Sequence, residues 1–350
     1  MNVVSTGKIS LAKNTLETGI ANLFAHFEAA YAMAPLQFGG RNFVCKTDLP
    51  GYFEVMDIAL DASAKIHETP CRLVVAQAGT LGLPHISWGE KYYQERECEA
   101  ALATTRYRAH FLPDDGFWQL FDKQSGSGIQ LMSTPEGYPL WDPGSPLRNF
   151  YHWSLSSRDR GLVHAGTLAS GGVGLMLAGP GGSGKSGTVL SGLIHGLSSV
   201  GDDYVVAKIE ADEVRAMPLF NTLKQDPEGI KRLALSSNRN ISSTVNWQGK
   251  HQFTLNDISP AARIEEMQVR ALCLPNIRGA ARTSIRRAGP KEAFLALAPS
   301  GVSQIPGDRD LSFSICARLS RLLPCYHVDL SNDPEEIAVA LRTFIEEELR

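Results

Sequence analysis

The sequence of 350 residues lacks long hydrophobic runs and an excess of charge of either sign. No stretch reaches the roughly 18 consecutive apolar residues of a membrane-spanning helix, and no secretory leader is recognisable. The sequence therefore predicts a cytoplasmic protein with no membrane partner. Lys and Arg number 34 against 37 Asp and Glu, a net charge of −3, so a general nucleic-acid binder is not expected.

Paired cysteines are also missing. The six cysteines are scattered, and none forms the C-x-x-C pair that is typical of zinc and redox sites. We therefore expect reduced thiols. Apolar residues make up 43% and charged residues 20% of the chain, which is typical of a globular protein. The length predicts roughly two domains of about 150 residues each.

The first 150 residues show signs of a mixed α/β domain. Apolar side chains recur at helical spacing over residues 15–33. After them, short apolar or alternating runs are separated by clusters of Gly, Pro, Asp and Ser, which predicts strands and turns. The candidate strands are 42–47, 71–77, 105–112, 117–121 and 128–132. No motif with a recognisable chemistry occurs here, so we predict that this domain recognises an acceptor or forms a homo-oligomer.

The pattern from 151 to 350 is that of a second, α/β domain. The candidate strands are 161–168, 173–178, 204–207, 269–274 and 326–330, and the candidate helices are 147–156, 227–235, 290–297, 310–323 and 334–348. Residues 238–256 are polar and without a clear pattern, which predicts a loop. The domain boundary is placed near residue 150.

A glycine-rich turn between the strand at 173–178 and a helix organises this second domain. It reads Gly179, Pro180, Gly181, Gly182, Ser183, Gly184, Lys185, Ser186 and then Gly187. Gly179–Ser186 fits the P-loop pattern, in which glycines let backbone N–H groups approach phosphates. Lys185 is expected to reach the outer phosphates of ATP, and the Ser186 hydroxyl to hold Mg²⁺. The alternative, a surface loop that contains a lysine, does not explain the strand and helix on either side.

Gly187 is unusual in this setting. It falls in the first turn of the predicted helix, where glycine costs roughly 1 kcal/mol of helix propensity. The sequence shows that the space beside Ser186 is left open, but not for what.

Two adjacent acids follow the P-loop at a meaningful distance. Asp202 and Asp203 lie 17 and 18 residues after Lys185, which is enough for one helix and a return to the sheet edge. We predict that Asp202 helps to hold Mg²⁺ and that Asp203 accepts a hydroxyl proton. The alternative is a solvated Asp-Asp turn. His164, 21 residues before Lys185, is a candidate to reach the phosphates or the acids, or else a core histidine.

These residues resemble a known family. The arrangement of Leu162-Val-His-Ala165, Gly179–Ser186 and Gly201-Asp-Asp203 is similar to the catalytic core of bacterial HPr kinase/phosphorylase and of related proteins with the phosphoenolpyruvate-carboxykinase-like P-loop fold. The resemblance covers residues 161–350. It implies that His164 assists at the phosphates and that Asp203 is the proton acceptor.

Two features of the family are not found in the sequence. The Arg-Gly-rich signature strand, which supplies a further acidic metal ligand, is not recognisable, and neither is the long loop that contacts HPr. The resemblance therefore implies a kinase of some other hydroxyl, in a peptide, a protein or a small metabolite.

A cluster of basic residues near 280 has no assigned role. Arg278, Arg282, Arg286, Arg287 and Lys291 form either a solvated loop or an anion clamp for phosphates or an acidic substrate. The sequence as a whole predicts an ATP-dependent kinase with Mg²⁺. A P-loop ATPase that transfers to water, and a nucleotide-binding interaction protein with little turnover, are the alternatives.

Overall fold

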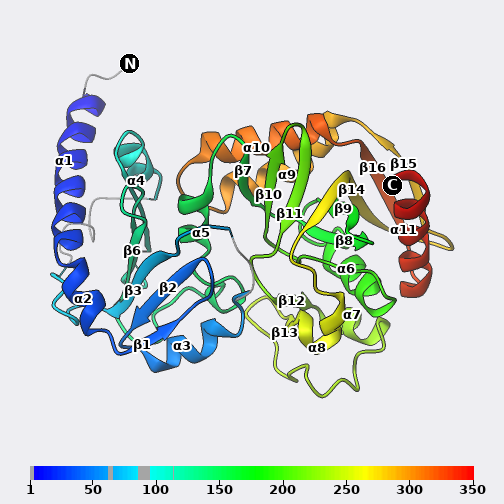
Figure 1. Ribbon diagram of the computed structural model, residues 1–350, viewed down its shortest axis with the longest axis horizontal. Helices are drawn as coiled ribbons and strands as arrows, with labels where there is room; N and C mark the ends of the chain where they lie inside the picture. Colours follow the sequence, from blue (N-terminus) through cyan, green and yellow to red (C-terminus); the bar gives the residue numbers. More distant parts are fainter. Residues whose placement is uncertain (1–3, 62–65, 86–94, 113) are drawn as a thin grey trace. The chain divides into compact units, whose positions relative to one another are not determined.

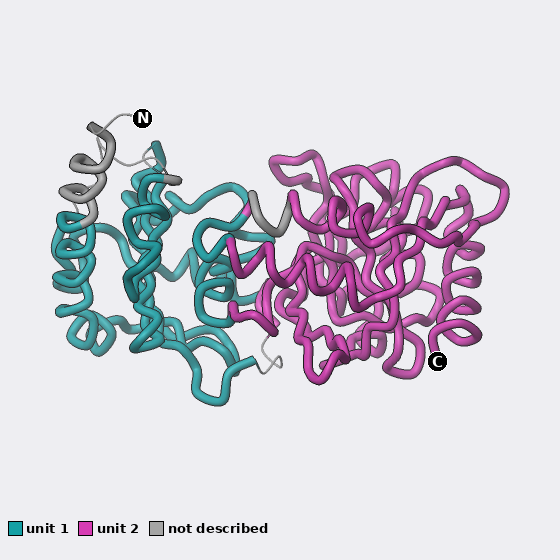
Figure 2. Tube along the Cα trace, turned by 90° about the horizontal axis from the view of Figure 1, so that it is seen from above, with its two compact units in different colours: residues 1–58, 65–155, 305–309 teal, residues 59–64, 156–304, 310–350 magenta. Residues whose placement is uncertain are grey.

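The structure, a computed structural model, describes residues 4–61, 66–85, 95–112 and 114–350 (Figure 1). The chain divides into two compact units (Figure 2). Unit 1 consists of Met1–Ile58, Lys65–Leu155 and Ile305–Arg309, and unit 2 of Ala59–Ala64, Ser156–Gln304 and Asp310–Arg350. The sequence-based division at residue 150 falls inside a helix, α5 (Arg148–Leu155), that belongs to unit 1.

Unit 1 is built on a mixed sheet of six strands in the order β1-β2-β3-β6-β5-β4. Its strands are β1 (Leu36–Phe38), β2 (Phe43–Thr47), β3 (Cys71–Gln77), β4 (Tyr107–Leu112), β5 (Phe117–Asp122) and β6 (Ser127–Met132). The central pairs β2·β3 and β3·β6 are parallel, and the outer pairs are antiparallel. All five strands predicted in this part of the sequence are confirmed to within two residues at each end.

The helices of unit 1 are α1 (Val4–Ala25), α2 (Phe27–Met33), α3 (Pro50–Asp57), α4 (Glu95–Leu102) and α5. The single helix predicted over 15–33 is wrong, because the helix breaks at His26. The His26 backbone N–H bonds to the Leu23 carbonyl three residues back, which tightens the turn. Beyond this turn Phe27 is buried, in the same core as Leu23 of α1.

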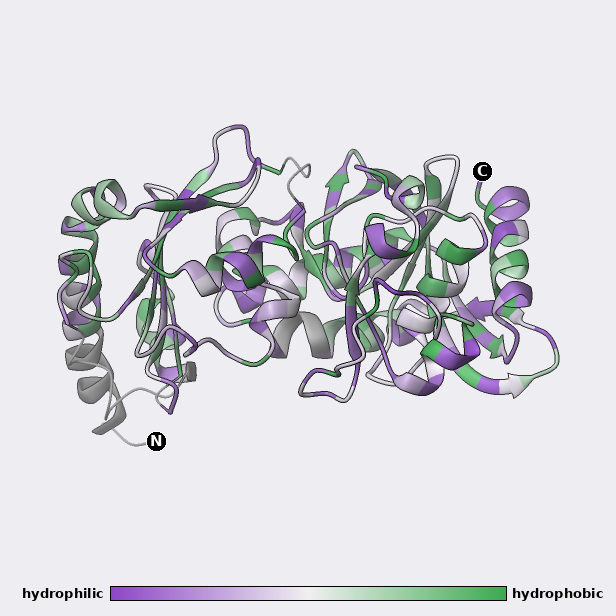
Figure 3. Cartoon of the chain, turned by 90° about the horizontal axis from the view of Figure 1, so that it is seen from below, coloured by the Kyte–Doolittle hydropathy of each residue, from purple (hydrophilic) through white to green (hydrophobic). Residues whose placement is uncertain are grey.

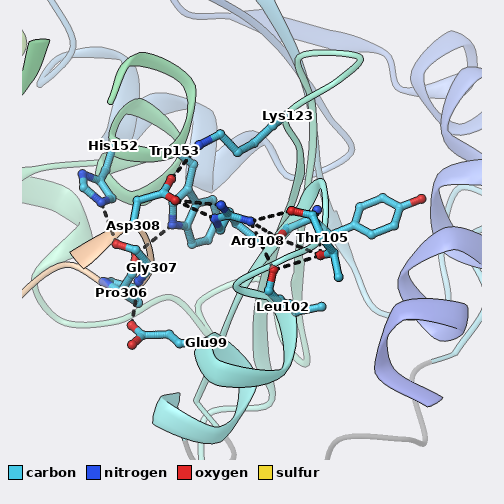
Figure 4. A network of polar contacts seen from close by, with 11 residues as sticks. Glu99, Leu102, Thr105, Arg108, Lys123, His152, Trp153, Pro306, Gly307 and Asp308 are labelled. Atoms are coloured by element: carbon cyan, nitrogen blue, oxygen red, sulfur yellow. Dashed lines mark hydrogen bonds and ion pairs between the residues drawn. The ribbon is translucent and has the colours of Figure 1, made fainter. Parts of the chain in front are cut away.

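A short segment from far along the sequence completes unit 1 (Figure 4). The Asp308 carboxylate accepts from Arg108 at 2.7 Å and from Lys123 at 2.8 Å. The backbone of the same segment bonds the α5 side chain of Trp153, whose indole N–H donates to the Pro306 carbonyl at 2.7 Å. Ile305–Arg309 is therefore integrated into unit 1 by buried polar contacts.

Unit 2 contains a mixed sheet of eight strands. Its path is β15-β16-β14-β11-β10-β7, and β9 pairs with both β14 and β8. The strands are β7 (Arg160–Val163), β8 (Gly166–Ser170), β9 (Val173–Leu177), β10 (Val205–Glu210), β11 (Glu213–Met217), β14 (Met267–Ala280), β15 (Ser284–Ala288) and β16 (Cys325–Ser331). The strand β14 runs parallel to β9 and to β16.

Two hydrophobic clusters share the strands of this sheet. In β14, Ala271 and Cys273 belong to the cluster that contains α6 (Lys185–Ile194) and α11 (Pro334–Glu348). Leu272 and Leu274 belong to the cluster that contains α9 (Pro290–Ser303) and α10 (Arg309–Leu322). This alternation is the period of two expected of a strand that is covered on both faces. In Figure 3 the helix next to the C-terminus, α11, alternates between hydrophobic and hydrophilic stripes, as expected of a helix that covers a sheet.

Smaller elements complete unit 2. The strands β12 (Thr222–Gln225) and β13 (His251–Thr254) form a two-stranded antiparallel sheet. Between them in the sequence lie α7 (Pro227–Arg232) and the loop after it. A short helix, α8 (Leu255–Ile258), follows β13. The loop predicted over 238–256 is therefore wrong at its end, where β13 begins.

The single strand predicted over 161–168 is wrong. The chain forms two strands there, β7 and β8, which pair with different strands of the sheet. The first strand pairs with β10 and the second with β9, and His164 lies in the connection. In the described part of the chain, no helix combines the length and the apolar character needed to cross a membrane.

Candidate functional site

The glycine-rich loop leads from β9 directly into α6. Gly184 precedes the first residue of the helix with a left-handed backbone, φ +102°. A side chain there would be strained, and its Cβ would lie 2.7 Å from a Leu330 methyl of β16. Glycine at this position thus lets the loop turn tightly against the sheet, with the exposed N–H groups of α6 at the turn.

Lys185 is folded back over the loop. Its ammonium donates to the Gly179 carbonyl at 2.6 Å and to the Pro180 carbonyl at 3.1 Å, and the residue is only 7% exposed. Burial lowers its pKa, and the Asp202 and Asp203 carboxylates act in the opposite direction. Both acids therefore lie within electrostatic reach of this lysine.

Asp202 is the buried member of the acid pair, with 2% of its surface exposed. Burial raises its pKa, and a hydrogen bond with the Ser186 side chain opposes this shift. Its Oδ1 atom is buried and has no hydrogen-bond partner. A Cβ at Gly166 would lie 2.9 Å from this atom and 2.6 Å from a Val189 methyl, so only glycine in β8 lets the carboxylate pack there.

The turn that carries the acids is fixed to β8 by Thr167. The Thr167 hydroxyl donates to the Gly201 carbonyl at 2.9 Å and accepts from the Val200 backbone N–H at 3.2 Å. The Ser199 hydroxyl accepts from the Gly201 N–H at 2.9 Å. These groups are buried, so the network holds the carboxylates in one place relative to the loop.

The Asp203 carboxylate lies between the side chains of His164 and Lys224. Its Oδ1 lies 2.9 Å from His164 Nε2 and its Oδ2 lies 2.9 Å from Lys224 Nζ. The His164 ring also stacks on Tyr204 with centroids 5.1 Å apart. Burial alone would raise the pKa of Asp203. The Lys224 ammonium and the His164 hydrogen bond outweigh burial and hold this pKa well below its usual value.

The structure brings the predicted site residues of the P-loop, the acid pair and His164 to one place. Their functional roles stay predictions. The sequence gives no indication of a role for Lys224. This lysine is the third residue of a short strand that pairs with β13, and no motif marks it.

The basic cluster near 280 does not form a loop. Arg278 lies in β14, and Arg286 and Arg287 lie in β15. Arg278 and Arg286 both approach Asp329, at 3.5 and 3.6 Å, while Arg287 lies over the Tyr326 ring at 4.5 Å. A solvated loop is therefore wrong for these three residues, and an anion clamp remains a prediction. Lys291 is the second residue of α9, and Arg282 lies in the turn after β14.

The donors near the loop suit a magnesium ion that is shared with phosphates. No group of three His, Cys, Asp or Glu side chains that could enclose a metal is found among the described residues. The Ser186 hydroxyl and the Asp202 carboxylate, which contact each other, provide two oxygen ligands. Magnesium is usually held by one or two carboxylates together with substrate phosphates, so this sparse set fits.

Comparisons with known proteins give little beyond this geometry. No protein-family model matches the sequence, and no curated protein matches it. Among solved structures, that of the Hpr(Ser) kinase/phosphatase from Coxiella burnetii is similar over 52% of this chain and 94% of that chain. The sequence identity is 13% and the TM-score is 0.29, so the relation is distant.

Proposed function

We propose that this protein is an ATP-dependent kinase that transfers the γ-phosphoryl group to a hydroxyl of a peptide, a protein or a small metabolite. The contact between Ser186 and Asp202 at the start of α6 carries the proposal, with Asp203 next along the chain. A phosphate-binding loop, a hydroxyl and a carboxylate for the metal, and a proton acceptor form the set that in-line phosphoryl transfer needs.

Phosphate binding falls to the loop and to Lys185. Backbone N–H groups of Gly179–Ser186 and of the first turn of α6 donate to the phosphate oxygens. Lys185, which otherwise donates to two loop carbonyls, turns to the outer phosphates. These donors are positioned in advance, so they stabilise the charge that spreads over the phosphoryl oxygens. Ser186 and Asp202 would hold Mg²⁺, which would neutralise charge on the nucleotide phosphates.

Asp203 takes the proton of the acceptor hydroxyl in this proposal. An ionised carboxylate has about four lone-pair sites, so its bonds to His164 and Lys224 leave room for a third partner. Its lowered pKa keeps it ionised at neutral pH. Because the transition state of phosphoryl transfer is loose, the position of the base counts for more than its strength.

The test is an ATP-turnover assay with Mg²⁺, run with and without a mixture of serine peptides and hydroxylated metabolites. Turnover that depends on an acceptor supports the kinase. Equal rates in both conditions would point instead to a P-loop ATPase or a regulatory nucleotide-binding protein that uses water.

Two variants sharpen this assay. Asp203→Asn should abolish transfer but leave nucleotide binding nearly unchanged. Asp212→Asn is the matched control, because Asp212 lies in an exposed turn with a left-handed backbone that Asn tolerates. If Asp203→Asn binds nucleotide poorly and transfers normally per bound nucleotide, Asp203 is not the base.

A further inference from the structure

We propose that Arg232 binds the α- and β-phosphates of the nucleotide in the Gly179–Ser186 loop. The inference rests on the proposed function and adds a residue that lies outside the P-loop motif and the acid pair. Arg232 is the last residue of α7, in the segment enclosed by β12 and β13.

The guanidinium of Arg232 lies against the first turn of α6. A Cβ added to Gly187 would lie 3.3 Å from Arg232 Nη2 and 3.9 Å from Gln225 Oε1. The space that glycine leaves beside Ser186 is thus the space that Arg232 enters. This contact explains why glycine occupies position 187 although it weakens the first turn of α6. A larger side chain there would crowd the Arg232 guanidinium.

Local contacts of α7 support this placement. Asp226 caps the helix by accepting from the Gly229 N–H at 2.7 Å, and Pro227 begins its first turn. Gln225 is 5% exposed and packs so closely on Gly229 that a Cβ there would lie 1.6 Å from its Nε2. Arg232 therefore extends from a helix that is capped by Asp226 and packed against Gln225, and not from a loop.

The charges around the loop favour an anionic ligand. In the part of the chain that the structure describes, the side chain of Arg232 has no hydrogen bond or ion pair, and the residue is exposed. Lys250, at the other end of the same segment, acts on the pKa of Lys185 and so lies within electrostatic reach of it. The segment that runs from β12 to β13 carries five Lys and Arg residues against two acids, Asp226 and Glu228. With Lys185, Asp202 and Asp203 added, the count is six cations to four carboxylates, so the loop and this segment together carry a net positive charge.

The position of Arg232 indicates which phosphates it contacts. In a P-loop the backbone N–H groups cradle the α- and β-phosphates, while the lysine reaches the β- and γ-phosphates. Gly187 is the third residue of α6, so a guanidinium beside it faces the α/β side. The forked donors of arginine match two phosphate oxygens at once. Arg232 should therefore contribute to the binding of ADP as well as of ATP.

The experiment is a calorimetric titration of the full-length protein with ADP in the presence of Mg²⁺. Arg232→Ala should raise the Kd for ADP about 10- to 50-fold, the size expected for hydrogen bonds to a charged group. Arg232→Lys, which keeps the charge but not the fork, should recover part of the loss. Lys231→Ala is the matched control, because it removes the neighbouring exposed cation of the same helix, and its Kd should stay within about twofold of the parent.

The outcomes separate the two proposals. If the parent protein binds ADP and Arg232→Ala binds it equally well, the inference about Arg232 is wrong while the nucleotide site stands. The same conclusion follows if Lys231→Ala loses as much affinity, because the effect is then general electrostatics. If the parent protein binds neither ADP nor ATP, the proposed function falls and takes the inference with it. Thermal unfolding of each variant checks that the fold is intact.

Discussion

Nζ of Lys224 lies 2.9 Å from Oδ2 of Asp203, although the two residues are 21 positions apart. The lysine belongs to β12 and the carboxylate to the turn before β10, so the ion pair fixes the small β12·β13 sheet to the acid pair. Lys224 is 15% exposed at its side chain, and the pair is therefore screened less than a surface ion pair.

This pair predicts the effect of Lys224→Met. The change removes the charge that orients Asp203, so transfer should fall at least about tenfold while nucleotide affinity changes little. Steady-state kinetics and ADP titration measure the two effects separately. Lys208→Met is the control, because Lys208 forms an exposed pair with Glu210 of its own strand, β10. Equal losses in both variants would contradict a role for the Lys224 pair.

Gly166→Ala should destabilise the fold and disturb the acid pair together. The new methyl would lie 2.6 Å from a Val189 methyl and 2.9 Å from Asp202 Oδ1, so the free energy of unfolding should fall by about 1–3 kcal/mol. Urea unfolding measures this loss. Gly51→Ala in α3 is the control, because a Cβ there meets nothing within 4 Å. A Gly166→Ala protein as stable as its parent would show that the packing around Asp202 is looser than described.

Asp142 in unit 1 predicts a dependence of stability on pH. Burial raises its pKa from 3.8 to about 7, although Tyr52 donates to its Oδ2 at 3.0 Å and Arg148 attracts its charge. The folded state therefore holds a proton more tightly than the unfolded state between these two values. The stability that Asp142 contributes is present below the lower pKa, is lost as the pH rises to about 7, and then levels off.

Comparison with Asp142→Asn isolates this effect, because the amide does not titrate. As the pH rises from 3.8 to about 7, the unfolding free energy of the parent should fall relative to that of Asp142→Asn. His110, whose pKa burial lowers to about 4, gives a slope of opposite sign and lines the same cavity as Asp142, so the comparison is made with His110→Gln introduced into both proteins. A difference that stays constant with pH would mean that Asp142 titrates normally in the folded protein.

Several elements were predictable because their signals are local. The strand before the glycine-rich loop and the helix after it follow from apolar periodicity, and β3 was located to the residue. The proximity of Asp202 to Ser186 followed from chain length alone, since one helix and a turn bring the chain back to the same sheet edge.

The remainder depends on contacts that are distant in sequence. The apolar run from 161 to 168 does not reveal that β7 and β8 pair with different strands. Lys224 lies in a strand of four residues whose partner, β13, comes 26 residues later, so its ion pair has no local signal. The sequence shows that position 187 has no side chain. Only the folded chain shows that Arg232 lies beside this position.

The integration of Ile305–Arg309 into unit 1 affects how the protein should be dissected. A gene fragment that stops after Leu155 would encode all six strands of the first sheet but not the carboxylate that pairs with Arg108 or the carbonyl that accepts from Trp153. Buried donors would lose their acceptors, a loss that costs about 1–3 kcal/mol for each group. We expect such a fragment to aggregate for this reason alone, so its behaviour would not report on the role of the first half of the protein.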